Sequence, residues 1–335
     1  MPVLADTAAL EGHMRSLGVA VAGPLTAELI TGGRSNLTYR LSDGVNRWVF
    51  RRLPIAGQTA SAHDVAREAR VTAALQSTGV PVPPVISLCQ DLAVIGAPFT
   101  ITTWIDGEVI RGRAELDQLV DEELRGACAS MIDVLASLHA VDPNAVGLED
   151  FGRPQGFVVR QVAPWRRQWE QVKTRELADL ERLHSRLELR LLVSAESAIL
   201  HGDYRIDNLI LDPGDRARVR TVLDWELSAL GEPRTDVALM CTYRHPALDA
   251  VLGIRRPGRA RGCPPPMTWR PRTSTVPAGT SVTGASPGAG APEARRHRRG
   301  NRLRVMAGAD AGRNARAAAD AVPELVAAGL ACLAD

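Results

Sequence analysis

An eight-residue segment, His201 to Asn208 (HGDYRIDN), carries the residue types that phosphoryl transfer requires. Asp203 is followed five residues later by Asn208, and Asp224 lies sixteen residues further on, in VLDWE. One aspartate of such a set orients a substrate hydroxyl and accepts its proton, while an asparagine and a second aspartate offer oxygen ligands to Mg²⁺. A lone aspartate in a loop is more often a cap or a surface charge. The order and spacing of the three residues together favour phosphoryl-transfer chemistry.

A second candidate lies upstream, where Gly32 and Gly33 precede Arg34, Ser35 and Asn36 between two expected strands. Glycines permit a tight turn, and backbone N–H groups exposed in such a turn can bind phosphate oxygens. A Gly-Gly pair is also an ordinary hairpin turn, so the pair alone does not decide between the two interpretations. Its position ahead of the Asp203 segment favours phosphate binding.

The elements that must position these residues fall into two groups. Short strands are expected up to about residue 106, with turn signals at Gly32-Gly33 and Asp43-Gly44. Helices are expected near residues 1–23, ending near Gly18, and at residues 63–79. Helices dominate afterwards. The helices expected in the second group are residues 115–140, 165–198 and 233–244. The pattern predicts an α+β fold of two lobes, a small β-rich N-lobe over residues 1–106 with the Gly-rich loop and a hinge, and a helical C-lobe over residues 107–254.

The net charge of +2 over 335 residues conceals an uneven distribution. Residues 1–254 hold 33 acidic and 26 basic side chains, whereas residues 255–300 hold ten arginines, one acidic residue and no Leu, Ile or Phe. Residues 255–319 therefore cannot build a core, and two explanations stay open: a disordered insertion, or compensating frameshifts that replaced core helices of the C-lobe. In either case we expect low stability and weak or no activity. A helix is expected again at residues 320–335.

Several classes of protein are disfavoured by composition. No run of about 18 apolar residues is present, so we expect no membrane-spanning helix. The N-terminus lacks the pattern of a secretory signal, and the five scattered cysteines form no CxxC pair, which disfavours a disulfide framework or a zinc site. The expectation is a cytoplasmic protein. The arginines near residues 295–304 are interpreted as a solvated basic tract rather than a nucleic-acid site.

Six segments together carry a family resemblance: TGGRSNLTYRL, WVFRRLP, REARVTAAL, LHAVD, HGDYRIDNLIL and VLDWELSALGEPRTDVA. Over about residues 20–250 the chain resembles the aminoglycoside phosphotransferase-type kinases, the small-molecule branch of the protein-kinase-like fold. Within that branch it is most similar to the kinase-like domain fused to some acyl-CoA dehydrogenases. The resemblance implies a two-lobed protein-kinase-like fold whose C-lobe is disrupted after about residue 255.

The resemblance also implies roles for the residues around the catalytic loop. Asp203 matches the catalytic aspartate, Arg205 stands where a cation neutralises charge near the transferred phosphate, and Asn208 and Asp224 match the Mg²⁺ ligands. Structural roles are implied for the remaining family positions. His201 would hydrogen-bond the backbone around Asp224, Asp236 would brace the catalytic loop, and His139 in LHAVD would be packed.

Nucleotide binding is implied for residues of the first lobe. Arg51 occupies the position of a phosphate-gripping cation that is lysine in most kinases, and Glu68 matches the glutamate that orients it. The alternative for Arg51 is a solvated charge at a strand edge. The backbone around Thr102 and Trp104 would bind adenine as the hinge. The full expected nucleotide set is Gly32, Gly33, Ser35, Asn36, Arg51, Glu68, Thr102 and Trp104.

The function implied by these roles is transfer of the γ-phosphate of ATP, with Mg²⁺, to a hydroxyl of a small molecule. The nearest group suggests a hydroxy acid or a hydroxyacyl thioester as the acceptor. The alternative is a non-catalytic, kinase-like protein that binds a nucleotide or another ligand and is inactive because of its altered C-lobe. No nucleic-acid or membrane partner is expected.

Overall fold

A computed structural model describes residues 6–30, 37–52, 65–173, 176–190, 197–243, 245, 247 and 321–332. The chain divides into two compact units. The first contains residues 1–107 and also Arg220–Ser228, and the second contains the remainder, Glu108–Val219 and Ala229–Asp335. The expected low-complexity segment, residues 255–319, lies outside the described residues. Among the described helices, none is long and apolar enough to cross a membrane.

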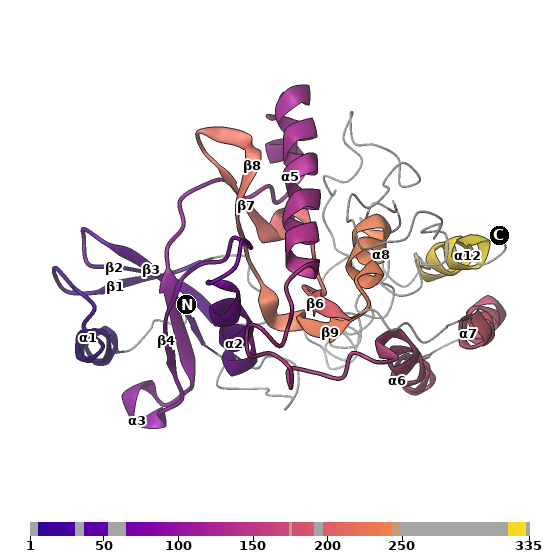
Figure 1. Ribbon diagram of the computed structural model, residues 1–335, viewed down its shortest axis with the longest axis horizontal. Coiled ribbons are helices and arrows are strands. Elements are labelled where there is room, and N and C mark those ends of the chain that lie inside the picture. Colours follow the sequence, from indigo (N-terminus) through magenta and orange to yellow (C-terminus); the bar gives the residue numbers. More distant parts are fainter. Residues whose placement is uncertain are drawn as a thin grey trace, which may run out of the picture. The chain divides into compact units, whose positions relative to one another are not determined.

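The first unit is built on a five-stranded sheet with the order β1-β2-β3-β5-β4, in which every neighbouring pair is antiparallel (Figure 1). Its strands are β1 (Thr26–Leu29), β2 (Leu37–Ser42), β3 (Arg47–Arg52), β4 (Val85–Cys89) and β5 (Phe99–Thr103). The turn between β2 and β3 was expected at Asp43 and Gly44, and this is confirmed. Gly44 has a φ of 91°, and the Asp43 carboxylate accepts hydrogen bonds from the N–H groups of Ala22, Val45 and Asn46. These bonds outweigh burial and hold the pKa of Asp43 below its usual value.

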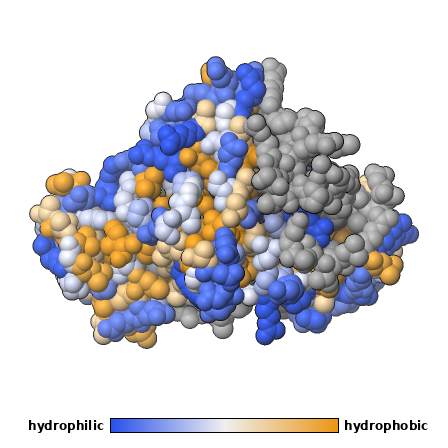
Figure 2. Space-filling view, viewed as in Figure 1, coloured by the Kyte–Doolittle hydropathy of each residue, from blue (hydrophilic) through white to orange (hydrophobic). Residues whose placement is uncertain are grey.

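One face of this sheet is covered by α1 (Thr7–Ser16), which places Leu10 and Met14 in a core with Tyr39, Phe50 and Phe99. The helix ends at the expected point, because Gly18 adopts a φ of 77° that favours glycine. Some apolar surface stays exposed near α1 and the short α3 (Leu92–Ile95), and hydrophobic residues appear in this region of Figure 2. Scattered exposure of this kind is common in soluble proteins.

The segment Arg220–Ser228 joins the first unit although it is distant in sequence. Val222 donates its N–H to the Pro81 carbonyl at 2.9 Å, and Arg67 of α2 (Val65–Leu75) donates to the Ser228 carbonyl at 3.3 Å. Trp225, in the short 3-10 helix η2 (Trp225–Leu227), is 2% exposed. These contacts fix the backbone on either side of Asp224.

The second unit combines helices with two small two-stranded sheets, β6–β9 and β7–β8. Its elements are α4 (Arg113–Leu116), α5 (Asp121–His139), α6 (Phe157–Val172), α7 (Ala178–Arg190), β6 (Ala198–Leu200), η1 (Ile206–Asn208), β7 (Leu209–Asp212), β8 (Asp215–Val222), β9 (Ala229–Gly231), α8 (Arg234–Thr242) and α12 (Val322–Cys332). The end of β8 passes into the first unit. The α+β class expected from the sequence is confirmed.

The helical region expected at residues 165–198 differs in detail from the structure. It is two helices, α6 and α7, of which α6 begins earlier, after Gly156 in a left-handed conformation, and the region ends in strand β6. The sequence suggested continuity because the whole stretch has a helical pattern that is charged on one side, which leaves α6 and α7 with a shared apolar side. That side packs Trp169 with Leu180, Leu183, Leu187 and Val326 of α12. The helix expected at the C-terminus is therefore present and contributes to this core.

Candidate functional site

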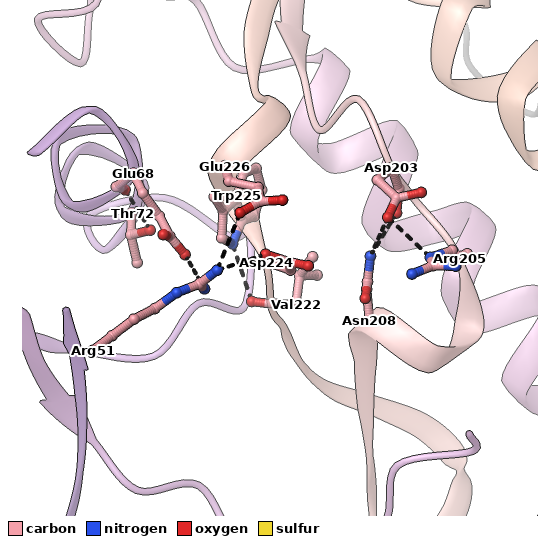
Figure 3. A network of polar contacts seen from close by, with 10 residues as sticks. All are labelled: Arg51, Glu68, Thr72, Asp203, Arg205, Asn208, Val222, Asp224, Trp225 and Glu226. Atoms are coloured by element: carbon pink, nitrogen blue, oxygen red, sulfur yellow. Dashed lines mark hydrogen bonds and ion pairs between the residues drawn. The ribbon is translucent and has the colours of Figure 1, made fainter. Parts of the chain in front are cut away.

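In the first unit, Arg51 binds three carboxylates (Figure 3). Its Nη1 lies 2.6 Å from Glu68 Oε1, and its Nη2 lies 3.0 Å from Asp224 Oδ1 and 3.4 Å from Glu226 Oε2. Arg51 follows the buried Phe50 on β3, so strand alternation turns it away from the α1 core. Its side chain is only 18% exposed, so it is an integrated part of a charge cluster and not a solvated edge residue.

The cluster carries more negative than positive charge, because one guanidinium faces three carboxylates. Burial, followed by the nearby charges of Asp224 and Glu226, raises the pKa of Glu68 to about 7, although Arg51 opposes this shift. The same carboxylates outweigh burial at Arg51 and raise the pKa of its guanidinium. An excess of carboxylate oxygen is the environment that a hard divalent cation prefers. All three carboxylates face the Arg51 guanidinium, however, and among the described residues no group of three or more His, Cys, Asp or Glu side chains is arranged to hold a metal ion.

Glu68 makes stability depend on pH. The folded protein binds the Glu68 proton more tightly than the unfolded chain does, because the pKa rises from 4.5 to about 7. The free energy of unfolding is therefore expected to fall as the pH rises from about 4.5 to 7, by up to about 3 kcal/mol. Urea unfolding at several pH values measures this slope. Glu68→Gln should remove that part of it, and identical slopes in the two proteins would contradict the assignment.

Asp224 has an unusual backbone. Its φ of 64° and ψ of 64° place it in the left-handed region, and among the described residues it is the only non-glycine with positive φ. Such a conformation costs free energy and persists where surrounding contacts enforce it. The hydrogen bond of Val222 and the burial of Trp225 supply those contacts. The fold thus holds the backbone of Asp224 in this conformation, with its carboxylate against the Arg51 guanidinium.

The expected hinge lies at the end of β5. Thr102 pairs with Val49 and Val85, and the N–H of Trp104 donates to the Arg47 carbonyl at 3.3 Å. The Trp104 indole and Arg47 both hydrogen-bond the exposed Asp106 carboxylate. The Trp104 N–H is already hydrogen-bonded to the Arg47 carbonyl. The adenine of a nucleotide bound here would therefore have to bond backbone carbonyl groups or the N–H groups of the residues after Trp104.

In the second unit, the loop that precedes β7 arranges the polar groups around Asp203 (Figure 3). Asn208 Nδ2 donates to Asp203 Oδ2 at 3.0 Å and to the Asp203 carbonyl at 2.9 Å. Arg205 Nε lies 3.0 Å from Asp203 Oδ2, and Arg205 Nη1 lies 3.2 Å from Asp207 Oδ2. Both bonds of Asn208 use its amide nitrogen, so its amide oxygen takes no part in them. An asparagine binds a cation through its amide oxygen, so these two bonds are compatible with such a role.

A buried carboxylate anchors this loop. Asp236, in the first turn of α8, is 0% exposed and accepts hydrogen bonds from the N–H groups of His201 and Gly202, at 2.9 and 2.8 Å. His139 Nε2, at the end of α5, lies 3.1 Å from Asp236 Oδ2. The imidazole Nδ1 of His201 accepts the N–H of Asp203 at 3.2 Å. Asp236 thus holds the backbone of this loop at His201 and Gly202. The His201 imidazole bonds the Asp203 backbone, whereas the sequence interpretation placed its bond at the backbone around Asp224.

Two residues in direct contact with the expected site were not singled out from the sequence. Glu226 follows Asp224 by two residues in VLDWE. That short spacing is the one sequence signal that could have placed Glu226 at the same site. Tyr243 donates its hydroxyl to Asp203 Oδ1, and the Arg205 guanidinium lies over its ring at 5.4 Å. Tyr243 lies 40 residues from Asp203, and no spacing rule links the two. The expected loop residues Gly32, Gly33, Ser35 and Asn36 lie outside the described residues.

Comparison with solved structures identifies the same fold elsewhere. A crystal structure from Ralstonia eutropha, provisionally assigned as an aminoglycoside phosphotransferase, aligns with a TM-score of 0.82 and 29% identity over 98% of each chain. A thermostable mutant of another aminoglycoside phosphotransferase, in a ternary complex with AMP-PNP and hygromycin B, aligns with a TM-score of 0.62 and 16% identity over 97% of this chain and 99% of that one. These neighbours confirm the expected kinase-like fold.

Sequence comparison gives the family. Acyl-CoA dehydrogenase family member 10 of Mus musculus is 37% identical over 246 residues, or 73% of this chain, and member 11 of Gallus gallus is 38% identical over 234 residues, or 69%. The chain spans only 23% and 30% of the length of these curated relatives. The pattern of the phosphotransferase enzyme family matches residues 26–264, which is more than half of the chain. The chain belongs to the phosphotransferase enzyme family.

Proposed function

We propose that the chain transfers the γ-phosphate of ATP, in the presence of Mg²⁺, to a hydroxyl of a small molecule. The observation that carries this proposal is the environment of Asp203, a carboxylate contacted by Arg205 and Asn208 in a loop that the buried Asp236 anchors. Such a carboxylate can orient a hydroxyl and accept its proton. Membership of the phosphotransferase enzyme family supports the same reaction class.

The proposed step is an in-line displacement. Asp203 accepts the proton of the acceptor hydroxyl as the acceptor oxygen forms a bond to the γ-phosphorus, and the bond from that phosphorus to the β,γ-bridging oxygen breaks, which releases ADP. Arg205 compensates negative charge close to Asp203. Mg²⁺, when bound, would neutralise charge on the phosphate oxygens, and Asp224 and Asn208 are the residues proposed to hold it.

The acceptor is proposed by analogy with the curated relatives. Their names place them among acyl-CoA dehydrogenases, which supports a hydroxyacyl thioester or a related hydroxy acid as the acceptor. The solved complex with hygromycin B makes an aminoglycoside the natural comparison substrate.

Turnover with a panel of acceptors tests this function. The purified full chain would be incubated with Mg²⁺-ATP and with hydroxyacyl-CoA thioesters, free hydroxy acids or aminoglycosides, and ADP release would be measured with and without EDTA. We expect EDTA-sensitive turnover with hydroxyacyl or hydroxy-acid acceptors. ATP binding without turnover on any acceptor would contradict the proposal and favour a non-catalytic binding protein.

Arg51 is proposed to contact the phosphates of the nucleotide while Glu68 orients it. Charge-assisted hydrogen bonds of this kind contribute about 1.5–3 kcal/mol, so Arg51→Ala should weaken Mg²⁺-ATP binding roughly 10- to 100-fold. Calorimetric titration measures the affinity. Arg40→Ala is the matched control, because Arg40 lies on the neighbouring strand β2 and pairs only at the surface with Glu28. Equal affinities of the two variants would remove Arg51 from the nucleotide site.

A further inference from the structure

Tyr243 follows the last turn of α8 and reaches the carboxylate of Asp203. Its hydroxyl donates to Asp203 Oδ1, while Arg205 covers one face of its ring at 5.4 Å. The contact joins the loop of residues 201–208 to the end of α8 within the second unit. Tyr243 is therefore placed by two independent contacts, one through its hydroxyl and one through its ring.

The two oxygens of Asp203 have different partners. Oδ2 accepts a hydrogen bond from Asn208 Nδ2 at 3.0 Å and forms an ion pair with the Arg205 guanidinium, whose Nε lies at 3.0 Å. Oδ1 accepts from a hydroxyl, that of Tyr243. A general base for an alcohol acceptor must offer an oxygen to a hydroxyl at hydrogen-bond distance. The Asn208 hydrogen bond and the Arg205 ion pair both involve Oδ2. Oδ1 is therefore the oxygen suited to that task, and the phenol has the same bonding pattern that an acceptor alcohol would have there.

We propose that Tyr243 is a positioning residue that holds the acceptor-hydroxyl position of Asp203 Oδ1 until an acceptor displaces it. This rests on the proposed phosphotransfer function. In the absence of an acceptor, the phenol hydroxyl of Tyr243 donates a hydrogen bond to Asp203 Oδ1 and keeps water from that oxygen. Ring stacking under Arg205 retains the side chain nearby during displacement. The acceptor class that fits is an alcohol able to donate one hydrogen bond to a carboxylate.

Water is the competitor that this arrangement excludes. If water occupied Oδ1, Asp203 would accept its proton as the water oxygen bonded to the γ-phosphorus, and the bond to the β,γ-bridging oxygen would break to give ADP and inorganic phosphate. The Asp203 proton would then return to solvent. Removing the Tyr243 hydroxyl should therefore raise hydrolysis of ATP in the absence of an acceptor, and should lower the KM for an acceptor more than it changes kcat.

The test uses the full chain with Mg²⁺-ATP and no acceptor. Tyr243→Phe keeps the ring under Arg205 and removes only the hydroxyl. We expect the rate of ADP release to increase at least about fivefold. That factor corresponds to roughly 1 kcal/mol, the advantage that water gains when the Tyr243 hydroxyl no longer competes with it for Asp203 Oδ1. The double variant Tyr243→Phe with Asp203→Asn should return to background, because the increase depends on Asp203.

Tyr204→Phe controls for the loss of a phenol in the same loop. The Tyr204 hydroxyl donates to the Met131 carbonyl at 2.7 Å and does not bond Asp203, so this variant should lower thermal stability without raising hydrolysis. Hydrolysis that depends on Asp203 but is equal or lower in Tyr243→Phe would overturn the assignment of Tyr243 and leave the proposed function standing. Hydrolysis that does not depend on Asp203 in any variant would overturn both.

Discussion

Asp203→Asn is expected to lower phosphoryl transfer at least about a hundredfold, the usual contribution of a general base, while Mg²⁺-ATP affinity stays near that of the wild type. An asparagine side chain has the size of the aspartate but cannot accept the proton of the acceptor. Arg205 keeps an ion pair after the change, because its Nη1 also lies 3.2 Å from Asp207. Initial rates and nucleotide titration, measured on the same preparation, separate the two effects.

A matched control for this change is Asp215→Asn. Asp215 is an exposed aspartate at the start of β8 whose carboxylate accepts the N–H of Ala217 at 3.2 Å. The phosphoryl-transfer rate of Asp215→Asn should equal that of the wild type. If Asp203→Asn retained more than about a tenth of the wild-type rate, a general-base role worth the usual factor would be excluded.

Asp236→Ala is expected to reduce the free energy of unfolding by about 3–5 kcal/mol, the cost of removing one partner from a buried charged network. The change would leave the N–H groups of His201 and Gly202, and the imidazole of His139, without their common acceptor. A loss of that size is comparable with the total stability of many domains. Urea unfolding measures it, and phosphoryl transfer should fall with it because the anchor of the Asp203 loop is gone.

Asp212→Ala provides the comparison for Asp236→Ala. Asp212 caps the turn to β8 by accepting the Gly214 N–H at 2.8 Å in an exposed position, so its loss should cost no more than about 1 kcal/mol. The two variants differ in burial and in the number of donors left behind. Similar destabilisation in both would show that Asp236 does not brace the loop.

The two networks were unequally accessible to sequence reasoning. The contact of Asn208 with Asp203 is local, so a spacing of five residues was enough to suggest it. The pairing of Arg51 with Glu68 was implied by the family resemblance and not by residue spacing, and in the structure the two side chains lie 2.6 Å apart. Tyr243 could not be predicted, since its contact with Asp203 depends on where α8 ends after packing. Its side chain carries no signal that distinguishes it from a core tyrosine.

The contrast between local signals and contacts that depend on packing also explains which helix and strand boundaries were predicted correctly. Hairpins and helix ends with glycine, such as Gly18 and Gly44, follow from local backbone preference and were placed well. The division between α6 and α7 was missed because both helices contribute to one apolar core, in which Trp169 and Leu180 pack together. Periodicity records which side of a helix is buried. It does not record where the chain turns back on itself.

The assignment of Arg220–Ser228 to the first unit has a consequence for synthesis of the protein on the ribosome. The Arg51–Asp224 contact spans 173 residues of sequence. When residue 107 has been made, Arg51 and Glu68 exist without Asp224 and Glu226, and at about 5–20 residues per second the missing segment follows only after roughly 6–24 seconds. During that interval the nascent sheet lacks Trp225 and the two later carboxylates. Completion of the first unit must therefore wait for translation of about half of the second, residues 108–219.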